Sequence, residues 1–166
     1  MPGRQDINPL EASMATSPST PDQASLEALR LRRAELRQSM NALELAMAEP
    51  APIGRARWAG RVQVALVELS ADFREHLEVT QGQAGVHSDV LAAAPRLSGA
   101  VARLARDHVQ ISHLVDDLIA RTSEPEPSVD QIRRLGTTLL GLLVSHRQRG
   151  SDLLYEAYEF VVGGET

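Results

Sequence analysis

Residues 97–115 read LSGAVARLARDHVQISHLV, and the spacing of their apolar side chains decides the fold class of the chain. Apolar residues recur every third or fourth position, which is the period of one face of an α-helix. One position on this face breaks the pattern, because His108 stands where a hydrophobic residue is expected. Burying an imidazole without a partner costs on the order of a few kcal/mol. The face consists of Leu97, Val101, Leu104, His108, Ile111 and Val115.

Two other segments repeat this arrangement around His76 and His146. The face around His76 consists of Val62, Leu66, Leu69, Phe73, His76 and Thr80. The face around His146 consists of Ile132, Leu135, Leu139, Leu142, His146 and Leu153. Three imidazoles directed into one interior need a common explanation, and a bound metal ion is the simplest one.

The whole chain is predicted to be an all-α protein, an antiparallel up-down four-helix bundle with a disordered N-terminal tail. Residues 1–21 are rich in Pro, Ser and Thr and form the predicted tail, while residues 22–162 form the bundle domain. A short helix at 88–94 is expected in the glycine-containing connection 81–95, and Gly163-Gly164 is expected to stop the last helix. The long helices are predicted from a cap at Thr20 or Asp22 to Glu49, and over 58–80, 96–121 and 129–160.

The heights of the three histidines in such a bundle agree with one another. Residues at one height in antiparallel helices are symmetric about the connecting loop. His108 and His146 are symmetric about position 127, and His76 and His108 about position 92, both within predicted connections. The same reflection through the first loop indicates that the first helix contributes a residue between Arg30 and Glu35, where no histidine occurs.

Composition excludes several classes of function. The chain has 166 residues, enough for one domain and a tail, with a net charge of −5 and no cysteine. Thiolate ligands are therefore excluded, and neither nucleic acid nor a membrane is expected as a partner. The chain also contains no lysine, so the segment QGQAGVH at 81–87 is no phosphate-binding loop. The absence of a signal sequence predicts a cytoplasmic protein, and nothing in the pattern specifies its oligomeric state.

The motifs FREH (73–76), ARDH (105–108) and SHRQRG (145–150) give the chain a resemblance to the hemerythrin-like HHE cation-binding family. The resemblance covers roughly residues 22–162. It implies a four-helix bundle with a non-heme iron site, mononuclear or dinuclear, with His76, His108 and His146 as ligands. It also implies chemistry with O₂, peroxide or nitric oxide, or sensing or storage.

The carboxylates of that family pattern are missing from this chain. Thr80 stands four residues after His76, and Gly150 four residues after His146, where the family commonly has glutamate. The remaining three nitrogens suit one divalent ion with open positions, and their type equally allows zinc. Glu35, Gln81 and Asp152 are the candidates for additional metal ligands.

Other interpretations remain open, and no catalytic residue is assigned. The histidines could bond to each other or to Thr80 in a metal-free degenerate bundle that binds a ligand or a protein, or the chain could be an oxygen-using biosynthetic enzyme. His113 lies on a polar face and is expected in solvent, while His87 could cap a helix, cover the site or have no role. Arg147 and Arg149 flank His146, where they form surface ion pairs or orient an anionic ligand.

Overall fold

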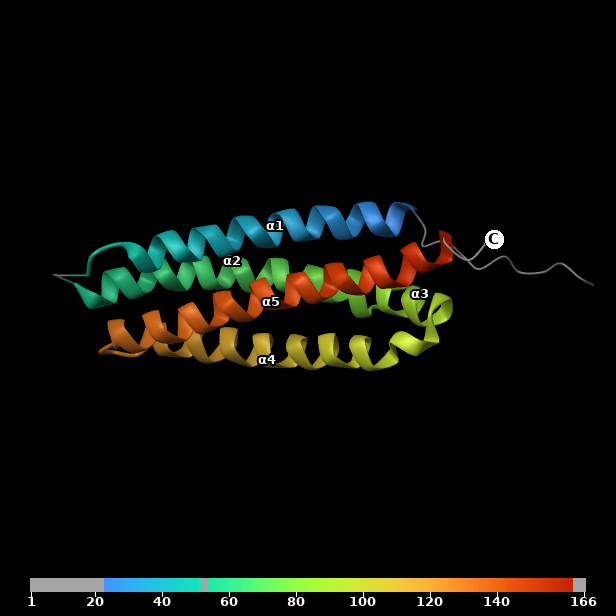
Figure 1. Ribbon diagram of the computed structural model, residues 1–166. Coiled ribbons are helices and arrows are strands. Elements are labelled where there is room, and N and C mark those ends of the chain that lie inside the picture. The colour runs from blue at the N-terminus through green and yellow to red at the C-terminus, as the bar shows by residue number, and fades with distance from the viewer. Residues whose placement is uncertain (1–22, 52–53, 163–166) are drawn as a thin grey trace, which may run out of the picture.

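Four long α-helices dominate the computed structural model, which describes residues 23–51 and 54–162, with side chains as far as residue 158. Figure 1 shows the long helices side by side, each antiparallel to the one before it. The prediction of an all-α chain with four long helices is confirmed over these residues, whereas the predicted tail 1–21 and the predicted stop at Gly163-Gly164 lie outside them. The elements are α1 (Gln23–Ala48), α2 (Arg55–Gln81), α3 (Val86–Ala93), a 3₁₀ turn (Pro95–Leu97), α4 (Ser98–Thr122) and α5 (Val129–Val162).

The four long helices enclose one apolar interior. α1 packs on α2, α2 on α4 and α4 on α5, while α5 meets α1 less extensively. Arg133 of α5 strengthens this last contact, because its guanidinium donates to the carbonyl oxygens of Met47 and Glu49 and lies 5.3 Å from the ring centre of Trp58. The largest fully buried apolar side chains are Trp58, Leu43, Leu66, Leu69, Ile111, Leu118, Ile132, Leu139 and Leu143.

α2 begins three residues earlier than the pattern predicted, at Arg55 instead of Trp58. The cause is Gly54, which has a φ of 100° and so adopts the left-handed conformation that residues with a Cβ rarely occupy. Its carbonyl oxygen accepts hydrogen bonds from the backbone N–H groups of Arg57 and Trp58. Gly54 therefore turns the chain directly into the helix.

α3 begins at Val86, two residues before the predicted short helix, and Gly85 is the reason. A Cβ at Gly85 would lie 2.6 Å from the backbone oxygen of Thr80, so only glycine fits this close to the end of α2. The earlier start carries His87 into the helix and into the interior, where it is buried. Pro95 opens the 3₁₀ turn that leads into α4.

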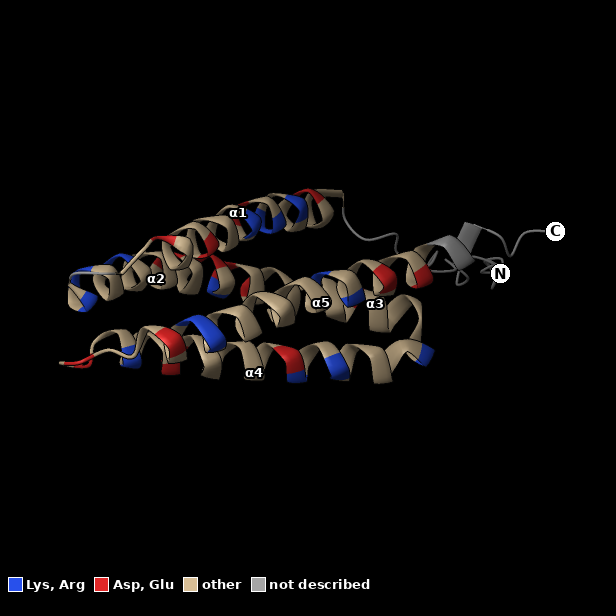
Figure 2. Cartoon of the chain, turned by 60° about the vertical axis from the view of Figure 1, so that its left-hand side comes forward, with Lys and Arg blue, Asp and Glu red and all other residues tan. Residues whose placement is uncertain are grey.

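The interior has two apolar clusters, with the predicted histidines at the boundary between them. Along α4, His108 separates Leu104 of one cluster from Ile111 of the other, and along α5 His146 separates Leu143 from Leu153. Charged residues occur along all four long helices (Figure 2). None of the described helices combines the length and apolarity needed to cross a membrane.

Candidate metal centre

His76 of α2, His108 of α4 and His146 of α5 meet in the bundle interior, which confirms the convergence predicted from the sequence. Their exposed fractions are 4%, 2% and 4%. The Nε2 atom of His146 lies 3.1 Å from Nε2 of His76 and 3.0 Å from Nε2 of His108. One ring nitrogen from each residue lies within 4.8 Å of the other two, so the group could hold a metal ion.

Hydrogen bonds among the three rings cannot satisfy all of their nitrogen atoms. A neutral imidazole has one N–H donor and one nitrogen lone pair. Nδ1 of His146 faces the Asp107 carboxylate at 3.4 Å, which favours the proton on Nδ1 and leaves a single lone pair on Nε2. Both His76 and His108 would have to share that lone pair, and their own Nδ1 atoms are buried without a hydrogen-bond partner in the described chain. One cation, by contrast, would accept all three Nε2 lone pairs at once.

The spacing of the nitrogens also fits a first-row divalent ion. For a metal–nitrogen distance of about 2.0–2.1 Å, neighbouring ligand nitrogens lie about 2.9 Å apart in an octahedral site and about 3.3 Å apart in a tetrahedral one. The observed separations of 3.0 and 3.1 Å fall between these values. The donor set and its geometry are therefore compatible with Fe(II), Zn(II) or a similar ion.

Burial keeps the three imidazoles neutral at pH 7. Desolvation lowers the pKa of His76 to about 3, and repulsion by His146 and Arg33 acts in the same direction. Desolvation likewise lowers the pKa of His108 to about 2. The pKa of His146 is also lowered by burial, although Asp107 opposes the shift. No proton has to leave these rings before a metal ion binds near neutral pH.

Asp107 is a supporting residue that the sequence analysis missed. Its Oδ2 atom lies 3.4 Å from Nδ1 of His146 and accepts hydrogen bonds from the Arg149 guanidinium at 2.9 Å. A carboxylate on the outer nitrogen of a metal-binding histidine sets the tautomer and the orientation of the ring. Asp107 and Arg149 each lie beside the core face of their helix. This shared position is the signal in the sequence that could have indicated a contact between them.

We expect Asp107→Asn to weaken Zn(II) binding by about 10- to 100-fold, because the amide no longer favours the Nδ1–H tautomer of His146. Competition with a chromophoric chelator measures the affinity, and ¹⁵N spectra of the His146 ring report the tautomer. The matched control is Asp117→Asn, which removes an exposed carboxylate paired with Arg121 on the same helix. Equal effects of the two substitutions would contradict the positioning role of Asp107.

His87 adds a fourth imidazole to the site, which the sequence analysis left open. It is buried, and its ring stacks on His108 with the centroids 5.7 Å apart and the planes at 4°. Desolvation lowers its pKa to about 4. His87 lies outside the group of three converging nitrogens, so its place is beside the candidate ligands.

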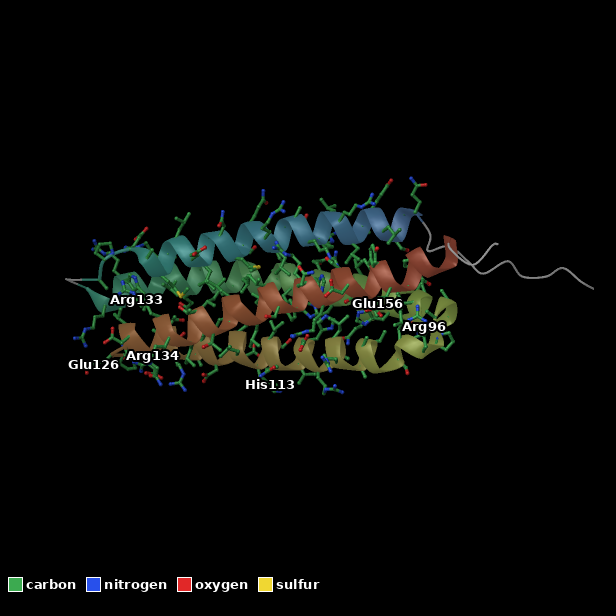
Figure 3. The ribbon with its side chains drawn as sticks, viewed as in Figure 1. Arg96, His113, Glu126, Arg133, Arg134 and Glu156 are labelled. Carbon is green, nitrogen blue, oxygen red and sulfur yellow. The ribbon has the colours of Figure 1, made fainter. Side chains whose placement is uncertain are left out.

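The candidate additional ligands do not join the three histidines. Glu35 pairs with Arg32 at 2.7 Å, Gln81 is exposed, and Asp152 is exposed and accepts a hydrogen bond from Gln148. The residue that α1 contributes at this height is Arg33, within the predicted interval. His113 is exposed on the outer side of α4, as predicted (Figure 3).

A small cavity adjoins the histidines on the side of α1 and α3. The space open to the centre of a water molecule is about 30 Å³. Its walls are mostly apolar, from residues such as Leu29, Leu36 and Leu153. Its polar wall includes Arg33, His76, Thr80, His87, His146 and Arg147. A molecule of two or three non-hydrogen atoms is the size that fits.

Comparisons of the chain with protein-family models, with curated proteins and with solved structures found no match. The resemblance to the hemerythrin-like family stays a prediction that depends on the three histidine motifs.

Proposed function

We propose that this protein is a hemerythrin-like metal-binding protein in which His76, His108 and His146 hold one divalent ion. The observation that carries the proposal is the convergence of three buried Nε2 atoms, two pairs of them 3.0 and 3.1 Å apart. Three neutral nitrogens leave coordination positions open, as in mononuclear sites that exchange water for a small ligand. Iron is the first choice because of the family resemblance, and zinc is the alternative that the ligands allow.

The number and class of ligands support one ion in preference to two. Among the described side chains, those of residues 23–51 and 54–158, His76, His108 and His146 form the single group of three or more histidines, aspartates or glutamates close enough to hold a metal ion. A dinuclear centre uses bridging carboxylates to balance the charge of two ions. At the two positions where the family resemblance would place such bridging carboxylates, this chain has Thr80 and Gly150. The adjoining cavity has the size of O₂, peroxide or nitric oxide, and binding, sensing or storing such a molecule is the proposed role.

A metal-free bundle that binds a small molecule is the second candidate function. The N···N separations of 3.0 and 3.1 Å are also hydrogen-bond distances, and this observation favours it. In that case the cavity alone would form the ligand site.

Elemental analysis of the full chain, purified without chelators and then reconstituted with Fe(II) or Zn(II), separates the two candidates. We expect about one ion per chain in the wild type and less than about one tenth of an ion in His108→Ala, because two nitrogens hold a first-row ion poorly. His113→Ala removes an exposed histidine from the same helix and should retain the metal. Metal content that is unchanged in His108→Ala would refute the proposal, and two ions per chain would refute the mononuclear site.

A further inference from the structure

The charged residues around the cavity are all cationic, although the chain as a whole is acidic. Arg33, Arg37 and Arg147 line the cavity, and no described lining residue is a carboxylate. The net charge of the chain is −5, so this local excess of positive charge runs against the average composition. Three of the four arginines of α1, Arg30, Arg32 and Arg33, lie in its N-terminal half, and Figure 2 shows the basic segments of this helix.

Arg33 is the cation placed deepest in this wall. Its Nη1 donates a weak hydrogen bond of 3.3 Å to Ser151 Oγ, and its Nε is buried without a hydrogen-bond partner in the described chain. Burial and the nearby charge of Arg147 lower the pKa of Arg33, so the surroundings disfavour its charge. A buried N–H donor on a charged group calls for an acceptor.

Gly150 of α5 gives the Arg33 guanidinium its place across the gap between α1 and α5. A Cβ at position 150 would lie 2.9 Å from Nη2 of Arg33, so a larger residue would displace the guanidinium. In the family that the sequence resembles, this position commonly carries a glutamate ligand. Here the missing side chain is replaced by a cation that reaches over from α1.

The arginines that line the cavity have no carboxylate partner among the described residues. Asp107 is engaged by Arg149 and His146, and no described carboxylate lies within ion-pair distance of Arg33 or Arg147. A divalent ion on the three neutral histidines would add two further positive charges. Cations in a partly buried site of low dielectric are stabilised by a nearby anion.

We propose that the cavity binds a small carboxylate, held by the Arg33 guanidinium beside the histidine cluster. The Nε–Nη2 edge of a guanidinium matches the two oxygens of a planar carboxylate, which chloride cannot reproduce. The cavity size limits the ligand to about the dimensions of formate, with three non-hydrogen atoms. This proposal deepens the proposed function. It rests on that function only in so far as the carboxylate also completes the coordination of the metal ion. The contact between the carboxylate and Arg33 needs no metal.

Titration of the full chain with sodium formate, at constant ionic strength maintained with sodium chloride, tests the proposal. The readouts are the ¹⁵N–¹H signal of Arg33 Nε and the backbone amide of Gly150, in chelator-treated and in Zn(II)-loaded protein. We expect saturable shifts with formate and none with chloride alone. Arg33→Gln should weaken formate binding about tenfold, because one charge-assisted bidentate contact is lost.

Arg30→Gln is the matched control, since Arg30 is exposed one turn earlier on α1 and its loss changes the net charge equally. Arg33→Lys keeps the charge without the planar edge and should bind with intermediate affinity. Far-ultraviolet circular dichroism checks that each variant is folded. If Arg33→Gln falls short of folding, Gly150→Ala should itself weaken binding, because its Cβ displaces the guanidinium.

The outcomes separate this proposal from the metal-binding proposal. Formate binding that depends on Arg33 in a protein that never retains metal would support the anion site and refute the metal site. Metal binding together with equal formate affinity in Arg33→Gln and Arg30→Gln would refute the anion site alone. Identical shifts with chloride and formate would also refute it.

Discussion

The metal-free protein is expected to lose about 6 kcal/mol of its free energy of unfolding between pH 7 and pH 5, an effect set by its buried histidines. The pKa values of His76, His87 and His108 in the folded state are about 3, 4 and 2. In the unfolded chain each returns to an ordinary value of about 6.5. A typical domain is stable by about 5–15 kcal/mol in total, so acid unfolding near pH 5 is expected.

The sign follows from proton linkage. Below pH 6.5 the unfolded chain binds protons on these histidines, whereas the folded protein keeps them neutral until the pH approaches their lowered pKa values. The unfolded state therefore gains free energy from protonation, and stability falls as the pH falls through this window. Each of the three histidines contributes about 2 kcal/mol between pH 7 and pH 5. His146 acts in the same direction, because its pKa is lowered as well.

Urea unfolding at pH 7, 6 and 5 in the presence of a chelator, followed by circular dichroism, measures this loss. His108→Leu fills a similar volume without a titrating group and should reduce the loss by about 2 kcal/mol. His113→Leu, which replaces an exposed histidine of the same helix, is the control. A free energy of unfolding that is constant from pH 7 to pH 5, or the same pH dependence in His108→Leu as in the wild type, would contradict the prediction.

Zinc is expected to raise the melting temperature of the protein by about 10 °C at pH 7. An ion that binds only the folded state stabilises it by about 4 kcal/mol at a thousandfold excess over its dissociation constant. For a chain of 166 residues, each kcal/mol corresponds to a shift of about 2–4 °C. The shift should change little between pH 8 and pH 6, because the ligand histidines are already neutral in this range.

Thermal scans with buffered Zn(II) test this result in variants of two histidines. His146→Ala removes the ring whose Nε2 lies near both other ligands and should abolish the shift. His113→Ala should keep the wild-type shift, because that side chain is exposed on the outside of α4. An equal shift in both variants would show that zinc binds elsewhere on the protein.

Helix periodicity explains why the sequence was informative about the three ligands. In a helix, the spacing of apolar residues indicates which side of each segment faces the core, and loop symmetry indicates which residues share a height. Together these two regularities predicted that His76, His108 and His146 meet. They also restricted the contribution of α1 to a short interval that includes Arg33.

The tertiary structure decided which neighbours complete the site. Successive residues of a helix are about 100° apart around its axis, so Arg33 and Glu35 are about 200° apart. Which of the two faces the site therefore depends on how α1 is rotated against α2 and α5. Asp107 became a partner of His146 only because α4 and α5 pack with these two side chains facing each other. Such rotations are set by side-chain packing across helices, which the pattern within one helix does not contain.

The sequence by itself determined the helical class, the buried faces and the three converging imidazoles, because these depend on regularities within single helices and on loop positions. The tertiary structure alone decided the entry of His87, the approach of Arg33 and the absence of a carboxylate among the described cavity-lining residues. His87 enters because Gly85 allows the chain to pass close to the carbonyl of Thr80. Arg33 enters because Gly150 leaves room for its guanidinium. The first of these contacts is made around the turn between α2 and α3, and the second is made between helices far apart along the chain. The pattern of residues within one helix predicts neither contact.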